Sequence, residues 1–178
     1  MRRFALSLIG RDRPGIVGAV TADLLRHELN IEDSQMTILR GHFAVVLILA
    51  GAATLDEQAL RADLERTAER LELDAISLNE IAEVQASAAP SCIATVYGVD
   101  HPGIVNAVAG ALAERAVNIT DLQTRLVAEP GTQELYAMTL ELSLPEGVSQ
   151  RDVEEVLARV HDEQGVEVSV RELERDLL

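Results

Sequence analysis

A stretch of 26 residues occurs twice in this chain, and the two copies align without a gap at a distance of 88 residues. The first copy is Gly10–Gln35, the second is Gly98–Gln123, and 13 of the 26 positions are identical. The identical positions include polar and glycine residues as well as apolar ones. Two unrelated helices with similar hydrophobic periods would share only the apolar positions. The repeat therefore predicts two copies of one domain. In the first copy the identical residues are Gly10, Asp12, Pro14, Gly15, Ile16, Val17, Ala19, Val20, Leu24, Asn30, Ile31, Asp33 and Gln35.

A length of 178 residues accommodates two domains of roughly 80 residues, each with a modest core. Residues 83–90 are rich in Ala, Ser, Gln and Pro and show little periodicity, which is typical of a linker. We predict a first domain over residues 1–83, a linker over 84–90, a second domain over 91–173 and a charged C-terminal tail over 174–178.

Hydrophobic periodicity predicts the elements of the first copy. Arg3–Ile9 alternates as a half-buried strand does, and the helical spacing that starts at Ile16 predicts a helix ending near Asn30. Ile31–Arg40 and His42–Ala50 flank a glycine and are typical of a hairpin.

The rest of the first copy and the whole second copy continue this order. Thr54 and Glu57 have the spacing of a capping box for a second helix, and a last strand runs to Ile81. In the second copy, Ser149 is the expected start of the last helix and Gly165 its end. The other expected elements of the second copy are strands over 92–98, 119–128, 133–144 and 166–170, a helix over 104–115 and a turn over 129–132.

The order strand, helix, strand, strand, helix, strand predicts an α+β fold of two tandem ferredoxin-like βαββαβ domains. In such a domain both helices cover one face of an antiparallel sheet. A strand as apolar as Ala44–Ala50 favours cover on the other face as well, by the second copy or by a second chain. We therefore expect a homodimer.

Composition excludes several classes of protein. The net charge is -15 and aromatic residues make up 2% of the chain, so direct contact with nucleic acid or an anionic membrane is disfavoured. The chain contains no Lys, which rules out a Schiff base or a Walker lysine. The lone Cys92 lies in an apolar run and is expected to be a buried small hydrophobe.

Motifs of catalysis and metal binding are also missing from the sequence. The four histidines have no metal-ligand spacing, and neither a nucleophile elbow nor a dinucleotide-binding glycine pattern occurs. We predict a protein that is not an enzyme and has no metal or cofactor. No apolar run is long enough to span a bilayer, and the N-terminal residues do not resemble a signal peptide, which favours a cytoplasmic location.

The repeated Asp-x-Pro-Gly segment offers a chemistry for ligand binding. A helix that begins directly after Gly15 or Gly103 presents free backbone N–H groups and the positive end of its dipole, which suit a carboxylate. The preceding Asp12 and Asp100 are placed to accept from an ammonium group. Two other interpretations stay open, because the Asp residues are also common helix N-caps and Asn30 and Asn118 are common helix C-caps.

The pattern Asp-Arg-Pro-Gly-Ile-Val, a helix of small residues and then Asn-Ile-x-Asp resembles the ACT domain, a module that senses small molecules. Two such units in tandem resemble the glycine cleavage system transcriptional repressor family. The resemblance implies a ligand where the loop and first helix of one domain meet the second strand of an adjacent domain. It implicates as ligand-binding residues Asp12, Gly15, Ile16, Asn30, Ile31, Asp100, Gly103, Ile104, Asn118 and Ile119.

Two functional hypotheses follow. In the first, the chain is a regulatory module that binds a small amino acid at domain interfaces and signals to a protein partner, with transcriptional regulation of glycine metabolism as the implied context. In the second, the copies have lost ligand recognition and form an oligomerisation scaffold. Arg13 in the first copy corresponds to His101 in the second, so the two candidate sites are not identical.

Overall fold

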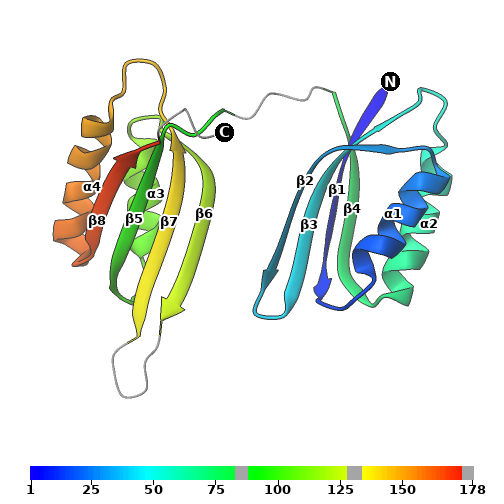
Figure 1. Ribbon diagram of the computed structural model, residues 1–178, viewed down its shortest axis with the longest axis horizontal. Coiled ribbons are helices and arrows are strands. Elements are labelled where there is room, and N and C mark those ends of the chain that lie inside the picture. Colours follow the sequence, from blue (N-terminus) through cyan, green and yellow to red (C-terminus); the bar gives the residue numbers. More distant parts are fainter. Residues whose placement is uncertain (83–87, 128–133, 174–178) are drawn as a thin grey trace. The chain divides into compact units, whose positions relative to one another are not determined.

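A computed structural model describes residues 1–82, 88–127 and 134–173. The chain divides into two compact units, Met1–Gln85 and Ala86–Leu178. The described residues of each unit form four strands and two helices in the order βαββαβ, and both helices lie on the same face of the sheet (Figure 1). The predicted α+β class and tandem ferredoxin-like architecture are thus confirmed.

In the first unit the sheet has the strand order β2-β3-β1-β4, with antiparallel neighbours throughout. The hairpin β2–β3 turns at Arg40 and Gly41, which both have positive φ as a tight primed turn requires. The elements are β1 (Arg2–Arg11), α1 (Ile16–Arg26), β2 (Asn30–Leu39), β3 (His42–Gly51), α2 (Glu57–Arg70) and β4 (Leu73–Ile81).

In the second unit the sheet has the equivalent order β6-β7-β5-β8. The elements are β5 (Cys92–Val99), α3 (Ile104–Ala113), β6 (Asn118–Val127), β7 (Leu135–Ser143), α4 (Gln150–Gln164) and β8 (Glu167–Glu172). The expected turn over 129–132 lies outside the described residues, as does the predicted tail over 174–178. Of the predicted linker, residues 88–90 have no helix or strand.

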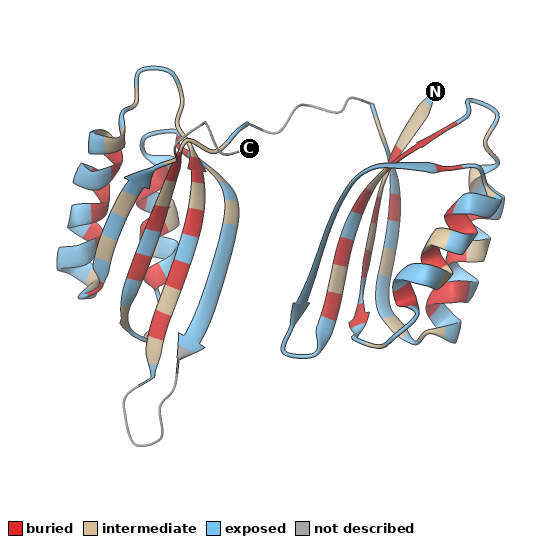
Figure 2. Cartoon of the chain, viewed as in Figure 1, coloured by how far each residue is buried: buried red, intermediate tan, exposed pale blue. Residues whose placement is uncertain are grey.

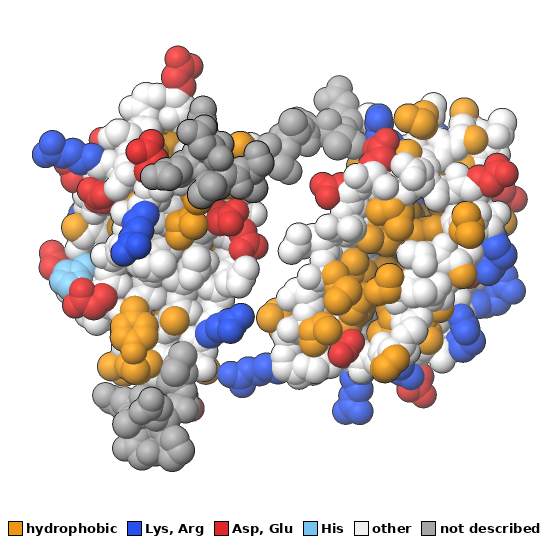
Figure 3. All heavy atoms as spheres, in the orientation of Figure 1, with side chains coloured by type: hydrophobic (Ala, Val, Ile, Leu, Met, Phe, Trp, Pro, Cys, Tyr) orange, Lys and Arg blue, Asp and Glu red, His pale blue; other side chains and the backbone are white. Residues whose placement is uncertain are grey.

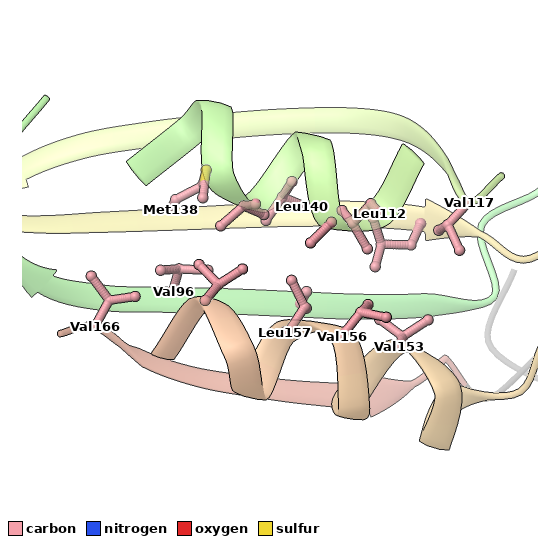
Figure 4. Close-up of a cluster of buried hydrophobic side chains, with 14 of the residues drawn as sticks. Val96, Leu112, Val117, Met138, Leu140, Val153, Val156, Leu157 and Val166 are labelled. Atoms are coloured by element: carbon pink, nitrogen blue, oxygen red, sulfur yellow. The ribbon is translucent and has the colours of Figure 1, made fainter. Parts of the chain in front are cut away.

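Each unit has its own hydrophobic core between its helices and its sheet. Along β1 and β3 the residues alternate between the buried helix side and the open side, and β2 is exposed along its whole length (Figure 2). In the second unit Leu112, Leu140 and Leu157 meet in the core between α3, α4 and the sheet (Figure 4). Cys92 is buried there, as predicted, and burial raises the pKa of its thiol.

The ends of the first helices differ from the prediction. Neither Asn30 nor Asn118 caps a helix, because each is the first residue of a strand. Instead Glu28 and Ala116 take the left-handed conformation, with φ of 54° and 53°. This earlier reversal places the next residues, Leu29 and Val117, in the core, and an apolar contact of this kind commonly accompanies a helix C-terminus.

The start of α2 also differs from the prediction. The N-cap is Asp56, whose carboxylate accepts from the N–H of Ala59 at 3.0 Å, so the expected capping box at Thr54 is wrong. The other predicted cap is confirmed, since Ser149 and Asp152 form a complete capping box and Gly165 ends α4 in the left-handed conformation. At the end of the chain, β8 continues two residues past Val170 to Glu172.

Candidate ligand-binding site

The first helix of each unit starts at a glycine corner. Gly15 precedes α1 with φ of 97°, and Gly103 precedes α3 with φ of 109°, a conformation that side chains strongly disfavour. No side chain caps either helix. The first-turn N–H groups of α1 and α3 are therefore not satisfied by a capping side chain.

The other two helices show that this chain caps its helices elsewhere. Asp56 caps α2 and Ser149 caps α4, each with a side-chain oxygen on a first-turn N–H. The interpretation of Asp12 and Asp100 as simple helix caps is wrong, because they lie three residues before the corner glycine and do not reach the helix. The two uncapped helix starts are thus the two that the repeat singles out.

The loops before α1 and α3 are each held by a backbone hydrogen bond to a residue just before the second strand of the neighbouring hairpin. The N–H of Asp12 donates to the carbonyl of Gly41 at 2.9 Å, and the N–H of Asp100 donates to the carbonyl of Glu134 at 3.2 Å. Asp12 and Asp100 are both exposed residues. Their carboxylates therefore remain hydrated beside the open helix starts.

A second attachment joins each loop to the end of the other helix of its unit. Arg13 pairs with Glu72 at 3.0 Å, just past the end of α2. His101 places Nε2 2.9 Å from the carbonyl oxygen of Gln164 and Nδ1 3.1 Å from that of Pro102. These two backbone acceptors, with the nearby charge of Asp100, raise the pKa of His101.

The first unit carries an apolar groove between α1 and the strands β2 and β3. Its volume is about 190 Å³. Phe43 and Val45 of β3 contribute to its lining, and Met36 at its edge is 48% exposed. Hydrophobic side chains form a band on one face of this unit (Figure 3). Residues of α1 and β2 that line the groove are Ile16, Val17, Val20, Thr21, Ile31, Ser34 and Met36.

The groove brings together some of the predicted site residues and not others. Ile16 and Ile31 both line it, and Gly15 immediately precedes its α1 wall. Asn30 lies at the opposite end of α1, whose 11 residues span about 16 Å. Asp12 and Asn30 of one unit therefore do not meet in that unit, and the same separation holds for Asp100 and Asn118 across α3.

The equivalent surface of the second unit has different side chains. From the strand pairings, Tyr136 corresponds to Phe43, Met138 to Val45 and Leu122 to Ser34. Tyr136 is buried, its hydroxyl donates to the sulfur of Met138 at 3.7 Å, and burial raises its pKa. Larger side chains thus occupy the second copy where the first has Ser34 and Val45.

Sequence reasoning missed Thr21, Ser34, Met36 and Phe43 as groove residues, because it followed positions that the two copies share. Positions that differ between the two copies could have indicated the groove, since Ser34 and Met36 align with Leu122 and Thr124. Within the described ranges no group of three His, Cys, Asp or Glu residues is arranged to hold a metal ion. No helix in the part of the chain that the structure describes is long and apolar enough to cross a membrane.

The repeated units, each with an antiparallel sheet covered on one face by two helices, define a tandem α+β protein of ferredoxin-like domains. The chain belongs to the ACT domain family, whose model matches residues 2–76 and 91–171. Among its relatives is the UPF0237 protein MK1213 of Methanopyrus kandleri. It is 38% identical over 81 residues, which are 45% of this chain and 90% of the relative.

Two solved structures resemble the whole chain. An unknown protein from Galdieria sulphuraria is 28% identical, with a TM-score of 0.80 over 97% of this chain and 99% of its own. A protein described provisionally as a glycine cleavage system transcriptional repressor is 15% identical, with a TM-score of 0.73 over 98% of each chain. Because the sequence identity to this second structure is 15%, the similarity shows a shared tandem fold and nothing more.

Proposed function

We propose that this chain is a non-enzymatic regulatory protein that binds a small amino acid at the starts of α1 and α3. The main observation behind the proposal is that α1 and α3 have no side-chain N-cap, whereas α2 and α4 do. Of the four helices in the described residues, α2 and α4 are capped by the side chains of Asp56 and Ser149, whereas α1 and α3 begin at glycine corners without a side-chain cap. Membership of the ACT domain family supports the same function.

The chemistry of the corner suits both ends of an amino acid. First-turn N–H groups and the helix dipole stabilise a carboxylate. The exposed carboxylates of Asp12 and Asp100 accept from an ammonium group. Asn30 and Asn118, at the far ends of their helices, contact the same ligand only if a neighbouring domain supplies them, as the family resemblance implies.

A ligand shared between domains gives a simple route to regulation. Because it contacts two domains at once, it stabilises the state in which they are paired by its difference in affinity for the two states. We propose a cytoplasmic homodimer for this role. The open face of the first sheet supports it, since Ile9 is 47% and Val46 49% exposed there.

Charge favours a protein as the downstream partner. With a net charge of -15, the chain would be repelled by nucleic acid, so control of transcription would act through another protein. The likeness in fold to the provisionally described glycine cleavage repressor suggests amino-acid metabolism, and glycine metabolism in particular, as the regulated process.

Calorimetric titration with a panel of amino acids that includes glycine and serine tests this function. We expect at least one to bind, and we expect Asp12→Ala with Asp100→Ala to weaken that binding about tenfold or more, because each substitution removes a charged hydrogen-bond acceptor. Glu69→Ala with Glu146→Ala is a matched control, since both residues are exposed and the net charge changes equally.

The control variant is expected to bind as the natural sequence does. A heat signal that the Asp12 and Asp100 substitutions leave unchanged would contradict the proposed site. Absence of binding by every amino acid, with assembly intact in both variants, would leave the oligomerisation scaffold as the function.

A further inference from the structure

The groove beside α1 in the first unit is apolar along almost its whole wall. Its volume of about 190 Å³ exceeds that of an engineered cavity of about 150 Å³ that admits benzene. The hydroxyl of Thr21, one of its few polar atoms, already donates to the carbonyl of Val17 at 2.9 Å. Any group that enters the groove must therefore be uncharged and hydrophobic.

The groove begins where the proposed amino-acid site ends. Ile16 and Val17 belong to the first turn of α1 and also line the groove. An α-carboxylate held at that turn would direct the attached side chain along α1 toward Met36. A side chain of three to five heavy atoms suits this space, whereas a peptide helix of about 10 Å diameter does not.

The corresponding wall of the second unit has different side chains, some smaller and some larger, since Thr124 replaces Met36 and Ala109 replaces Thr21. Met138 replaces Val45 and Leu122 replaces Ser34, and both replacements add side-chain volume at the corresponding wall. The buried Tyr136, bonded to Met138, further stiffens that wall. The two copies have thus diverged at the groove while keeping the glycine corner.

We infer that the first unit selects an amino acid with an aliphatic or thioether side chain, such as leucine or methionine, over glycine and serine. This inference rests on the proposed function, and it adds the class of side chain that the site of the first unit takes. The selectivity arises because the groove buries side-chain carbons that glycine does not have, each worth about a fourfold gain in affinity when fully buried.

The test compares calorimetric titrations of the full chain with leucine, methionine and glycine. We expect leucine or methionine to bind about tenfold or more tightly than glycine. Ser34→Leu with Val45→Met copies the second unit into the first and should weaken leucine binding at least about tenfold, with little change for glycine.

Ala62→Leu is the control. It adds side-chain volume at an exposed position of α2 that does not line the groove, and it should leave leucine binding unchanged. Met36→Thr is a second groove variant, which copies Thr124 of the second unit. Because Met36 is half-exposed, this variant should fold even if the double variant does not. Thermal unfolding of each variant confirms that the fold is kept.

Each outcome is informative. Glycine binding as tightly as leucine would overturn the selectivity and leave the proposed function standing, whereas no binding by any amino acid would remove both. If the double variant changes only the monomer–dimer equilibrium, measured by light scattering, the groove is a subunit contact and the inference is wrong.

Discussion

At the scale of single residues, the loops that precede α1 and α3 are held by different contacts at one aligned position, Arg13 in the first unit and His101 in the second. Arg13 carries a permanent charge and pairs with Glu72. His101 faces two carbonyl oxygens, of Gln164 and Pro102, and a neutral imidazole has only one N–H to donate. The two bonds form together only with the protonated ring, so the attachment of the loop in the second unit depends on the charge of His101.

This difference predicts how stability depends on pH. The pKa of His101 is raised above 6.5 in the folded chain, chiefly by the Gln164 and Pro102 carbonyls. Its contribution to the free energy of unfolding is therefore fully present below about pH 6.5 and is lost as pH rises through the raised pKa. Denaturation of the natural sequence and of His101→Gln between pH 5.5 and 8.5 should show this extra loss only in the former.

A nuclear magnetic resonance titration of the His101 ring provides the direct check. Its midpoint in the folded protein should exceed the midpoint in urea. A folded midpoint equal to or below the unfolded one would show that the two carbonyl contacts do not hold the proton.

At the scale of elements, the sequence predicted the order, the repeat and nearly all strand positions, because hydrophobic periodicity is a local property. It misplaced two helix boundaries. The end of α1 is set by burial of Leu29, a tertiary effect, and the start of α2 by Asp56 in competition with the nearby Thr54. The groove was missed because β2 and α1 come together only in three dimensions.

The starts of α2 and α1 predict different effects of an Asp→Ala substitution on the free energy of unfolding. Asp56→Ala removes the carboxylate that caps α2 and should lower the free energy of unfolding by about 1 kcal/mol. Asp12→Ala should change it by less than about 0.5 kcal/mol, because Asp12 caps no helix. Urea denaturation followed by circular dichroism measures both, and an equal loss in the two variants would return Asp12 to a capping role.

At the scale of the whole molecule, duplication has produced two units with one architecture and two local chemistries. The conserved features are the glycine corner, its uncapped helix and the hydrogen bond that holds the loop to the hairpin. The divergent features are the groove and the residue that fastens the loop. We infer that the corner serves the function common to both units and that the surrounding side chains set what each unit binds.

The most direct measurement of the central claim is an amide chemical-shift titration of isotope-labelled protein with leucine, serine and glycine. The open helix starts predict that a binding amino acid shifts the amides of Ile16, Val17 and Gly18 first and saturably, because its carboxylate accepts from that turn. If the amides of the first turns of α1 and α3 stay unmoved while others shift, or if none shifts, the uncapped helix starts are not the ligand site.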